Sequence, residues 1–426
     1  MKKLLLFSAI ITAGIVNNVS AQVDEFGYTQ VNATTGPSYQ NQVFFDLSEN
    51  VLTSQPANIW DIAFYRNGGA MSFGTRVNDA QAIETYQASV DPAQWDNINI
   101  NDIGSWGEPL YNPDLTNDLQ EGAFEQATLT CSILSVGWGC YNIGNHHIDG
   151  KTIFVLKYPN GSYIKFMLTD YFGGYTFKYS KWNGASWDAT ITKTIPNGSA
   201  DSLFNYYSFT TNDVVNNVEP SRTKWDFMLT RYYTFYMGQM MYRLSGIVQG
   251  PNISVAQTSE TQGTAAVNLP ATTEFKKGIT TIGHSWKPTS GLIPNVVYYI
   301  KEDNKYYRLY FTENGGSSTG NMYFKYKDIT SLLSSNEVNV KVSFGLYPNP
   351  APNKQVTLLY DVKNGAENQG NIAIYDLSGK LVQQTEISKT QGFFKKDLDL
   401  SRLQSGIYLV KLTVGSHTET KKLILK

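Results

Sequence analysis

The chain has 426 residues and a formal net charge of −2 at pH 7, with 13% aromatic and 16% charged residues. This length exceeds what one hydrophobic core supports and predicts about three domains. Residues 22–340 carry 20 basic and 29 acidic side chains and no basic run, so they give no footprint for nucleic-acid binding. The abundance of Tyr, Phe and Trp favours an all-β fold.

The first 21 residues are typical of a secretory signal peptide. Lys2 and Lys3 precede an apolar stretch at 4–16, and small side chains follow before Gln22. We expect cleavage between Ala21 and Gln22. The apolar stretch is too short to cross a bilayer, and no later segment approaches the roughly 18 unbroken apolar residues of a membrane helix. The sequence therefore predicts an exported protein without a transmembrane segment.

Between the signal peptide and the tail, the chain repeats one pattern. The segment WDIAFYR at 60–66 recurs as WDFMLTR at 225–231, and each follows an aromatic strand. A hairpin at 153–170 corresponds to one at 297–313, and each precedes a Phe-Lys-Tyr triplet. A period of roughly 145 to 165 residues is far longer than a solenoid repeat. We therefore expect two tandem domains, termed the first and the second copy.

Composition sets the predicted boundaries. The first copy spans 22–190, the second copy spans 205–330, and a tail domain spans 341–426. Clusters of Pro, Asn, Gly and Ser predict linkers at 191–204 and 331–340.

Each copy resembles the HmuY family, all-β haem-binding proteins of Bacteroidetes. The features that carry the resemblance are the aromatic strand, the WD strand ending in Arg, a Gly/Trp element and the hairpin. The resemblance covers 42–179 and 206–327 and implies two tandem HmuY-like domains. Its motifs belong to the framework, so we expect Trp60 and Trp225 to fill cores. We expect the two motif aspartates to accept hydrogen bonds from backbone donors or to pair with the arginine of their own copy: Asp61 with Arg66, and Asp226 with Arg231.

In that family, ferric haem is held in an apolar crevice by axial His or Met side chains on variable loops. The first copy offers Met71 and the adjacent His146 and His147, which we interpret as solvated turn residues. The second copy offers a Met- and Tyr-rich run at 232–242, with His284 further on. Such a run is also typical of simple packing at a strand or loop. The candidate axial ligands are Met237, Met240 or Met241, paired with His284.

The two cysteines, Cys131 and Cys140, lie close together in a Gly-containing stretch. In an exported protein, the simplest interpretation is one local disulfide that closes a short loop. A redox-active pair is the alternative, although the chain has neither the CxxC spacing nor a thioredoxin-like βαβ pattern.

No catalytic fingerprint marks this chain as an enzyme. It lacks GxSxG, HExxH, GxGxxG and P-loop motifs, and it contains only 4 histidines. A hydrolase site assembled from distant carboxylates stays open as an alternative, because sequence alone does not bring such residues together. We expect a binding protein with no catalytic residues and no metal site.

The tail has features of its own. It begins with LYPNP at 346–350, continues with alternating strands at 356–360, 371–376 and 406–412, and ends on KKLILK at 421–426. These features resemble the C-terminal sorting domain of Bacteroidetes type IX secretion cargo. The resemblance implies a seven-stranded β-sandwich that docks with the outer-membrane translocon and is removed by its sortase. An ordinary immunoglobulin-like domain is the alternative.

The sequence thus predicts an all-β protein that is exported through the periplasm to the medium or to the outer-membrane surface. Capture of haem or a related tetrapyrrole is the predicted function. The alternative is a structural or adhesive surface protein that keeps the HmuY-like framework without a haem ligand. Surface lipopolysaccharide is a further expected partner where the protein stays attached to the cell.

Overall fold

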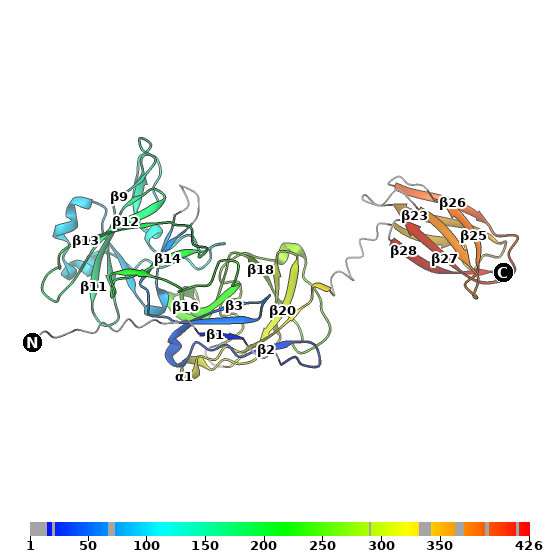
Figure 1. Ribbon diagram of the computed structural model, residues 1–426, viewed down its shortest axis with the longest axis horizontal. Helices are drawn as coiled ribbons and strands as arrows, with labels where there is room; N and C mark the ends of the chain where they lie inside the picture. Colours follow the sequence, from blue (N-terminus) through cyan, green and yellow to red (C-terminus); the bar gives the residue numbers. More distant parts are fainter. Residues whose placement is uncertain are drawn as a thin grey trace, which may run out of the picture. The chain divides into compact units, whose positions relative to one another are not determined.

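The protein folds into two compact units, residues 1–329 and 330–426 (Figure 1). Regular structure in the described part is mostly β-strand, as the predicted all-β class requires. None of the described helices has the length and apolarity needed to cross a membrane. The computed structural model describes residues 15–18, 22–66, 73–288, 291–331, 342–362, 370–387, 392–414 and 417–426. Ala21 of the predicted cleavage site therefore lies outside the described residues.

The described part of the first unit forms two lobes, each built from two sheets. The first lobe has the strand orders β15-β14-β5-β6 and β13-β12-β11-β10-β7, with β8 and β9 attached to β11. Its strands are β5 (Ile62–Tyr65), β6 (Thr75–Val77), β7 (Glu84–Ser89), β8 (Gly139–Tyr141), β9 (Ile148–Gly150), β10 (Ile153–Lys157), β11 (Tyr163–Tyr171), β12 (Gly174–Lys181), β13 (Ile191–Pro196), β14 (Phe204–Ser208) and β15 (Asp213–Val215).

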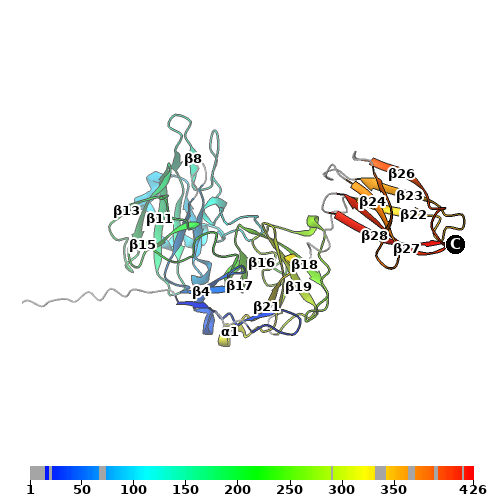
Figure 2. The same cartoon turned by 45° about the vertical axis from the view of Figure 1, so that its right-hand side comes forward.

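The second lobe has the strand orders β1-β4-β3-β16-β17 and β18-β19-β20-β21-β2, which correspond to those of the first lobe apart from β1 here and β8 and β9 there. Figure 2 shows strands of both sheets of this lobe together, among them β16, β17, β18 and β19. Its strands are β1 (Ile15–Asn18), β2 (Thr29–Val31), β3 (Asn41–Asp46), β4 (Val51–Pro56), β16 (Phe227–Tyr236), β17 (Met240–Gln249), β18 (Ile253–Ser259), β19 (Val296–Glu302), β20 (Lys305–Phe311) and β21 (Phe324–Asp328). A single helical turn, α1 (Gly316–Thr319), lies between β20 and β21.

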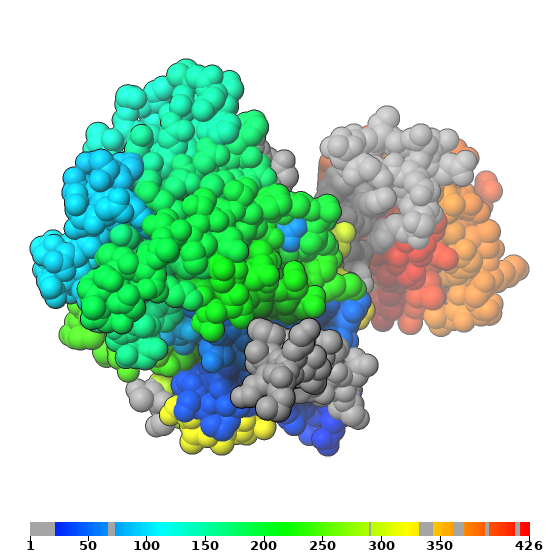
Figure 3. All heavy atoms as spheres, turned by 60° about the vertical axis from the view of Figure 1, so that its left-hand side comes forward, coloured from blue at the N-terminus to red at the C-terminus, as the bar shows by residue number. Residues whose placement is uncertain are grey.

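Each lobe takes its aromatic strand from the other copy. In the second lobe, β3 pairs with β16, and Phe45 lies opposite Phe227. In the first lobe, β14 pairs with β5, and Tyr207 lies opposite Ile62. The N-terminal β2 also crosses over and pairs with β21, so that blue and yellow residues lie side by side in the space-filling view (Figure 3).

This exchange corrects the prediction of two consecutive domains joined by a linker at 191–204. Residues 1–329 form one compact unit. Within the predicted linker, β13 (Ile191–Pro196) pairs with β12 as part of the first lobe, and β14 begins at Phe204. The compact units divide at Ile329, and most of the predicted second linker lies outside the described residues.

Side-chain alternation along the exchanged strands builds three apolar layers. In β3, Val43 and Phe45 face the core of the second lobe, whereas Phe44 faces a central cluster between the lobes. In β5, Ile62 faces the core of the first lobe, and Ala63 faces the central cluster. The long apolar runs in these strands therefore reflect burial on both faces.

The motif tryptophans belong to this central cluster. Trp60 and Trp225 are 8% and 2% exposed, and they share one cluster rather than filling two separate cores. Trp60 meets Tyr206 edge-on with ring centroids 4.9 Å apart, and Trp225 meets Phe44 in the same way at 5.2 Å. Each tryptophan thus packs on the aromatic strand that the other copy supplies.

The second unit is a β-sandwich with strand orders β22-β23-β26 and β25-β24-β27-β28 in its described part. Alternating apolar residues of both sheets meet in one core, which includes Leu358, Ile372 and Val410. The strands are β22 (Val342–Tyr347), β23 (Gln355–Val362), β24 (Gly370–Tyr375), β25 (Leu381–Glu386), β26 (Gly392–Asp399), β27 (Gly406–Val414) and β28 (His417–Leu425).

Candidate functional site

The motif aspartates fix the exchanged strands. Asp61 Oδ2 accepts a hydrogen bond from the backbone N–H of Phe209 at 2.7 Å, just after β14. Asp226 Oδ2 accepts one from the backbone N–H of Leu47 at 2.7 Å, just after β3. The expected backbone donors are therefore present, but they come from the other copy. These contacts give the aspartates a structural role.

The structure does not show the expected pairing of the motif aspartates with the arginines of their own copies; the arginines have other partners. Arg66 donates to Ser202 Oγ at 2.9 Å. The guanidinium of Arg231 lies over the Tyr39 ring, 5.3 Å from its centroid. Burial raises the pKa of Asp226 to about 7.

The hairpin formed by β16 and β17 ends in an exposed apolar tip. Its turn contains Met237 and Gly238, both with positive φ, and Gln239 N–H donates to Tyr236 O at 3.1 Å. This left-handed backbone suits a tight hairpin turn. Four apolar side chains here are more than half exposed, which is unusual for large apolar groups that are close together. They are Phe235 at 58%, Met237 at 76%, Met240 at 58% and Tyr242 at 52%.

His284 approaches one face of this hairpin. Its Nδ1 lies 2.9 Å from Tyr232 Oη, and its ring centroid is 6.0 Å from that of Tyr236. Burial, assisted by the positive charge of Lys287, lowers the pKa of His284 and so favours neutral imidazole. In the tautomer whose Nδ1–H donates to Tyr232, the Nε2 lone pair is available to a ligand.

Strand register separates the predicted methionines. Met240 lies opposite Tyr236, and Met241 lies opposite Phe235. Because neighbouring residues of a strand point to opposite faces, Met240 shares the face of Tyr236 and His284, whereas Met241 does not. Tyr232 and Tyr236, which contact His284, lie in the predicted Met- and Tyr-rich run but were not named as candidates, although their even spacing along β16 is the alternation that places them on one face.

The histidines of the first copy lie in the turn between β8 and β9, and each has its own partner. His146 Nδ1 lies 2.6 Å from Tyr141 Oη. His147 Nδ1 lies 2.7 Å from Asp170 Oδ1, and its ring stacks on Phe172 with centroids 4.6 Å apart. His146 is exposed, as expected of a solvated turn residue, whereas His147 is half-buried against Asp170 and Phe172. Met71 lies outside the described residues, and the part of the chain that is described has no group of three or more His, Cys, Asp or Glu side chains that could hold a metal ion.

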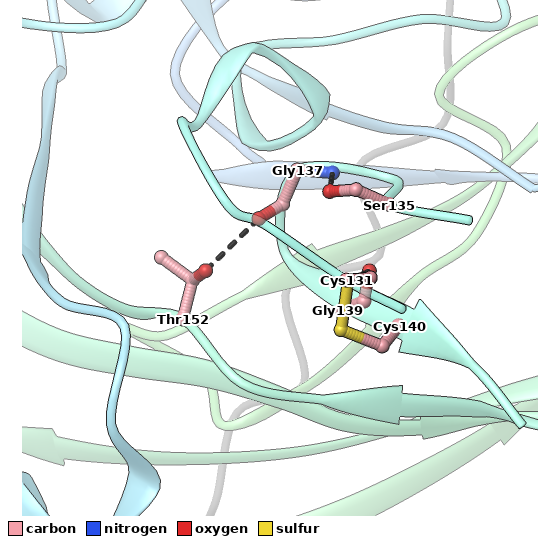
Figure 4. The surroundings of a disulfide bond; sticks show 6 residues. All are labelled: Cys131, Ser135, Gly137, Gly139, Cys140 and Thr152. Atoms are coloured by element: carbon pink, nitrogen blue, oxygen red, sulfur yellow. Dashed lines mark hydrogen bonds between the residues drawn. A yellow bond between two sulfur atoms is a disulfide. The ribbon is translucent and has the colours of Figure 1, made fainter. Parts of the chain in front are cut away.

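Cys131 and Cys140 form a disulfide with Cα atoms 5.6 Å apart (Figure 4). The loop that it closes carries Gly137, whose φ is +76° and whose Cβ, if present, would lie 2.4 Å from Glu125 O. Only glycine fits there. The next residue, Trp138, is fully buried and donates through Nε1 to Glu125 Oε1 at 3.0 Å. The disulfide thus anchors the loop that places Trp138 in the core of the first lobe.

Two parts of the chain match models of known protein families. Residues 38–183 match the family model of the HmuY protein, and residues 345–426 match that of the secretion system C-terminal sorting domain. The chain carries an HmuY domain and a sorting domain. The sorting domain indicates export by type IX secretion to the cell surface or outside, so this is a secreted or surface protein. A search of curated proteins found no match to the chain.

The HmuY match runs from before β3 to after β12. It includes the disulfide and both neighbouring histidines, His146 and His147. One HmuY match was found, and it does not extend to the predicted second copy. The candidates Met237, Met240, Met241 and His284 therefore lie outside the HmuY domain as matched.

Proposed function

We propose that this exported protein binds haem or a related tetrapyrrole at the tip of the β16–β17 hairpin, without enzymatic activity. The observation that carries the proposal is the exposed Met- and Tyr-rich tip beside His284. A porphyrin offers two broad apolar faces and an iron that accepts an imidazole or thioether ligand. Exposed apolar side chains of the tip would cover such a face, and burying them on the ligand would be favourable.

His284 and Met240 are the proposed axial donors. The lowered pKa of His284 supports iron binding, because only neutral imidazole has a free lone pair. Tyr232 at Nδ1 would orient the ring and fix the tautomer, as partners of metal-bound histidines do. Met240 lies on the same face of the hairpin as Tyr236, which contacts His284. Met237, in the turn, is a secondary thioether donor.

A second candidate function is adhesion through the same apolar tip without haem. It is supported by the position of the tip outside the residues that match the HmuY family. In either case we propose that the sorting domain engages the type IX translocon and its sortase, and that lipopolysaccharide is the anchor of any surface-attached form.

The test is a titration of the purified protein with hemin, followed by the Soret band and the ligand-sensitive visible bands. We expect saturable binding, with shifted bands and weaker affinity in His284→Ala and in Met240→Ala. Met241→Ala is the matched control, because it removes a thioether from the opposite face of the same strand.

Two other results would contradict the hairpin site. If only His146→Ala or His147→Ala changed the bands, the haem site would lie in the HmuY-matched part. If no variant and no parent protein bound hemin saturably, haem binding would be excluded, and adhesion would be the better proposal.

A further inference from the structure

A cavity of about 60 Å³ lies between the lobes of the first unit, and none of the exposed side chains of the hairpin tip lines it. Its walls come from both copies and include the rings of Phe44, Trp60, Tyr206, Trp225 and Tyr232. Since a water molecule needs roughly 10–15 Å³ on this measure, the cavity has room for about four water-sized groups. Arg76, Met228 and Arg231 in the wall are partly exposed, which gives a small molecule a route from solvent.

Three residues in this wall carry buried N–H groups that lack a hydrogen-bond partner among the described residues. They are Gln42 Nε2, Trp225 Nε1 and Arg231 Nε. Gln42 and Trp225 are each only 2% exposed. The orientation of the Gln42 amide is set by its Oε1, which accepts from Trp60 Nε1 at 3.4 Å. Buried donors without an acceptor are costly, so their presence beside one cavity indicates a missing acceptor.

Both carboxyl groups in the wall already accept hydrogen bonds from protein donors. Asp79 Oδ1 accepts from Asn112 Nδ2 at 2.8 Å. Glu219 accepts from the backbone N–H of Phe204 at 2.8 Å and from Tyr206 Oη at 3.1 Å. Burial also raises the pKa of Asp79 to about 6 and that of Glu219 to about 7. At pH 7 Asp79 is then mostly ionised and Glu219 about half ionised, so the positive charge of the Arg76 and Arg231 guanidinium groups exceeds the negative charge of these two carboxyls.

We infer that this cavity binds a small organic carboxylate. The carboxylate oxygens would accept from the unpaired N–H groups of Gln42, Trp225 and Arg231, while a short apolar tail would lie against the aromatic rings. The size of the cavity limits the ligand to molecules near acetate or propionate. The site uses side chains of both copies, so it exists only in the strand-exchanged unit.

The experiment is calorimetric titration of the purified full chain with sodium propionate, with propanol as a neutral probe of similar size. We expect saturable binding of propionate at one site and none of propanol. Trp225→Phe keeps a ring but removes Nε1–H, and Gln42→Met removes the amide. Each should weaken binding about tenfold or more, as expected for a lost hydrogen bond to a charged group.

Trp286→Phe is the matched control, since Trp286 is buried in the core of the second lobe and does not line the cavity. It should bind propionate as the parent does. Circular dichroism checks that each variant is folded, and a rise in Tm with propionate gives an independent measure of binding. Absence of saturable propionate binding, equal binding of propanol, or unchanged affinity in both Trp225→Phe and Gln42→Met would each overturn the inference.

Discussion

Trp225 ties the two lobes together at the scale of a single residue. Its ring packs on Phe44 of the other copy's aromatic strand in the shared central cluster. We expect Trp225→Ala to lower the free energy of unfolding by about 3–5 kcal/mol, as for other buried large aromatics. Because the cluster is shared, the first unit should still unfold in a single transition, whose midpoint shifts to a lower urea concentration. Urea denaturation followed by fluorescence and by far-UV circular dichroism measures this.

The partly exposed Trp106 provides the control, and Trp106→Ala should cost clearly less. Two separate transitions, of which only one responds to Trp225→Ala, would show instead that the lobes unfold independently.

Buried carboxyl groups make the stability of the first unit depend on pH. Burial raises the pKa of Glu219 from 4.5 to about 7. The folded state therefore holds the proton of the Glu219 carboxyl more tightly than the unfolded state does. The contribution of this protonation to the free energy of unfolding is complete below pH 4.5 and is lost as the pH rises to 7. We expect the unit to be more stable at pH 5 than at pH 8, and we expect Glu219→Gln to reduce this difference by about 2–3 kcal/mol.

The test is to measure the urea midpoints of the parent protein and of Glu219→Gln at several pH values between 5 and 8. Glu274→Gln is the control, since Glu274 is exposed and should leave the profile unchanged. Parallel profiles for the parent protein and Glu219→Gln would contradict the assignment.

At the scale of elements, the exchange of strands determines which fragments can fold. A fragment of residues 205–330 contains β16 to β21 but lacks β2, β3 and β4, which complete both sheets of the second lobe. We expect this fragment to show no cooperative unfolding, whereas residues 22–329 should unfold cooperatively. Urea denaturation and amide hydrogen exchange compare the two. A cooperative transition in the isolated fragment would mean that the copies fold as separate domains.

Several elements of the first unit could be predicted from sequence, because their signals are local. The alternating hairpin of β10 and β11 and the strand after each WD motif are where periodicity places them. The partner of each strand could not be predicted in this way. The aromatic strands β3 and β14 have similar apolar patterns, so nothing local decides which of them pairs with β5 and which with β16. That choice depends on how the intervening chain packs.

For the candidate site, the residue types could be predicted from sequence, but their relative positions could not. The Met-rich run and His284 were identified by residue type. Their mutual positions depend on register, which sets Met240 and Met241 on opposite faces of β17. The cavity between the lobes could not be found from sequence, because its walls depend on the exchange.

At the scale of the whole molecule, the two compact units have separate cores and separate tasks. The sorting domain holds its own apolar core, and residues 1–329 hold theirs. Deletion of residues 330–426 should therefore leave the free energy of unfolding of the first unit within about 0.5 kcal/mol of the parent value. It should also retain the protein inside the cell envelope. Cell fractionation with immunoblotting measures the second effect, and appearance of the truncated protein in the medium would contradict the assigned export role.

The pairing of β2 with β21 has a consequence for biosynthesis. Thr29 lies opposite Tyr326, so the first unit begins and ends in neighbouring strands of one sheet. Closing so long a loop is entropically expensive and gives the unit a high contact order, which slows folding. As the ribosome releases the chain from its N-terminus, β5 of the first lobe must wait for β14, and in the second lobe β3 must wait for β16 and β2 for β21. The second lobe therefore cannot complete its sheets until β21 has been synthesised, so we expect the nascent chain to remain incompletely folded for longer than a domain built from local pairings would.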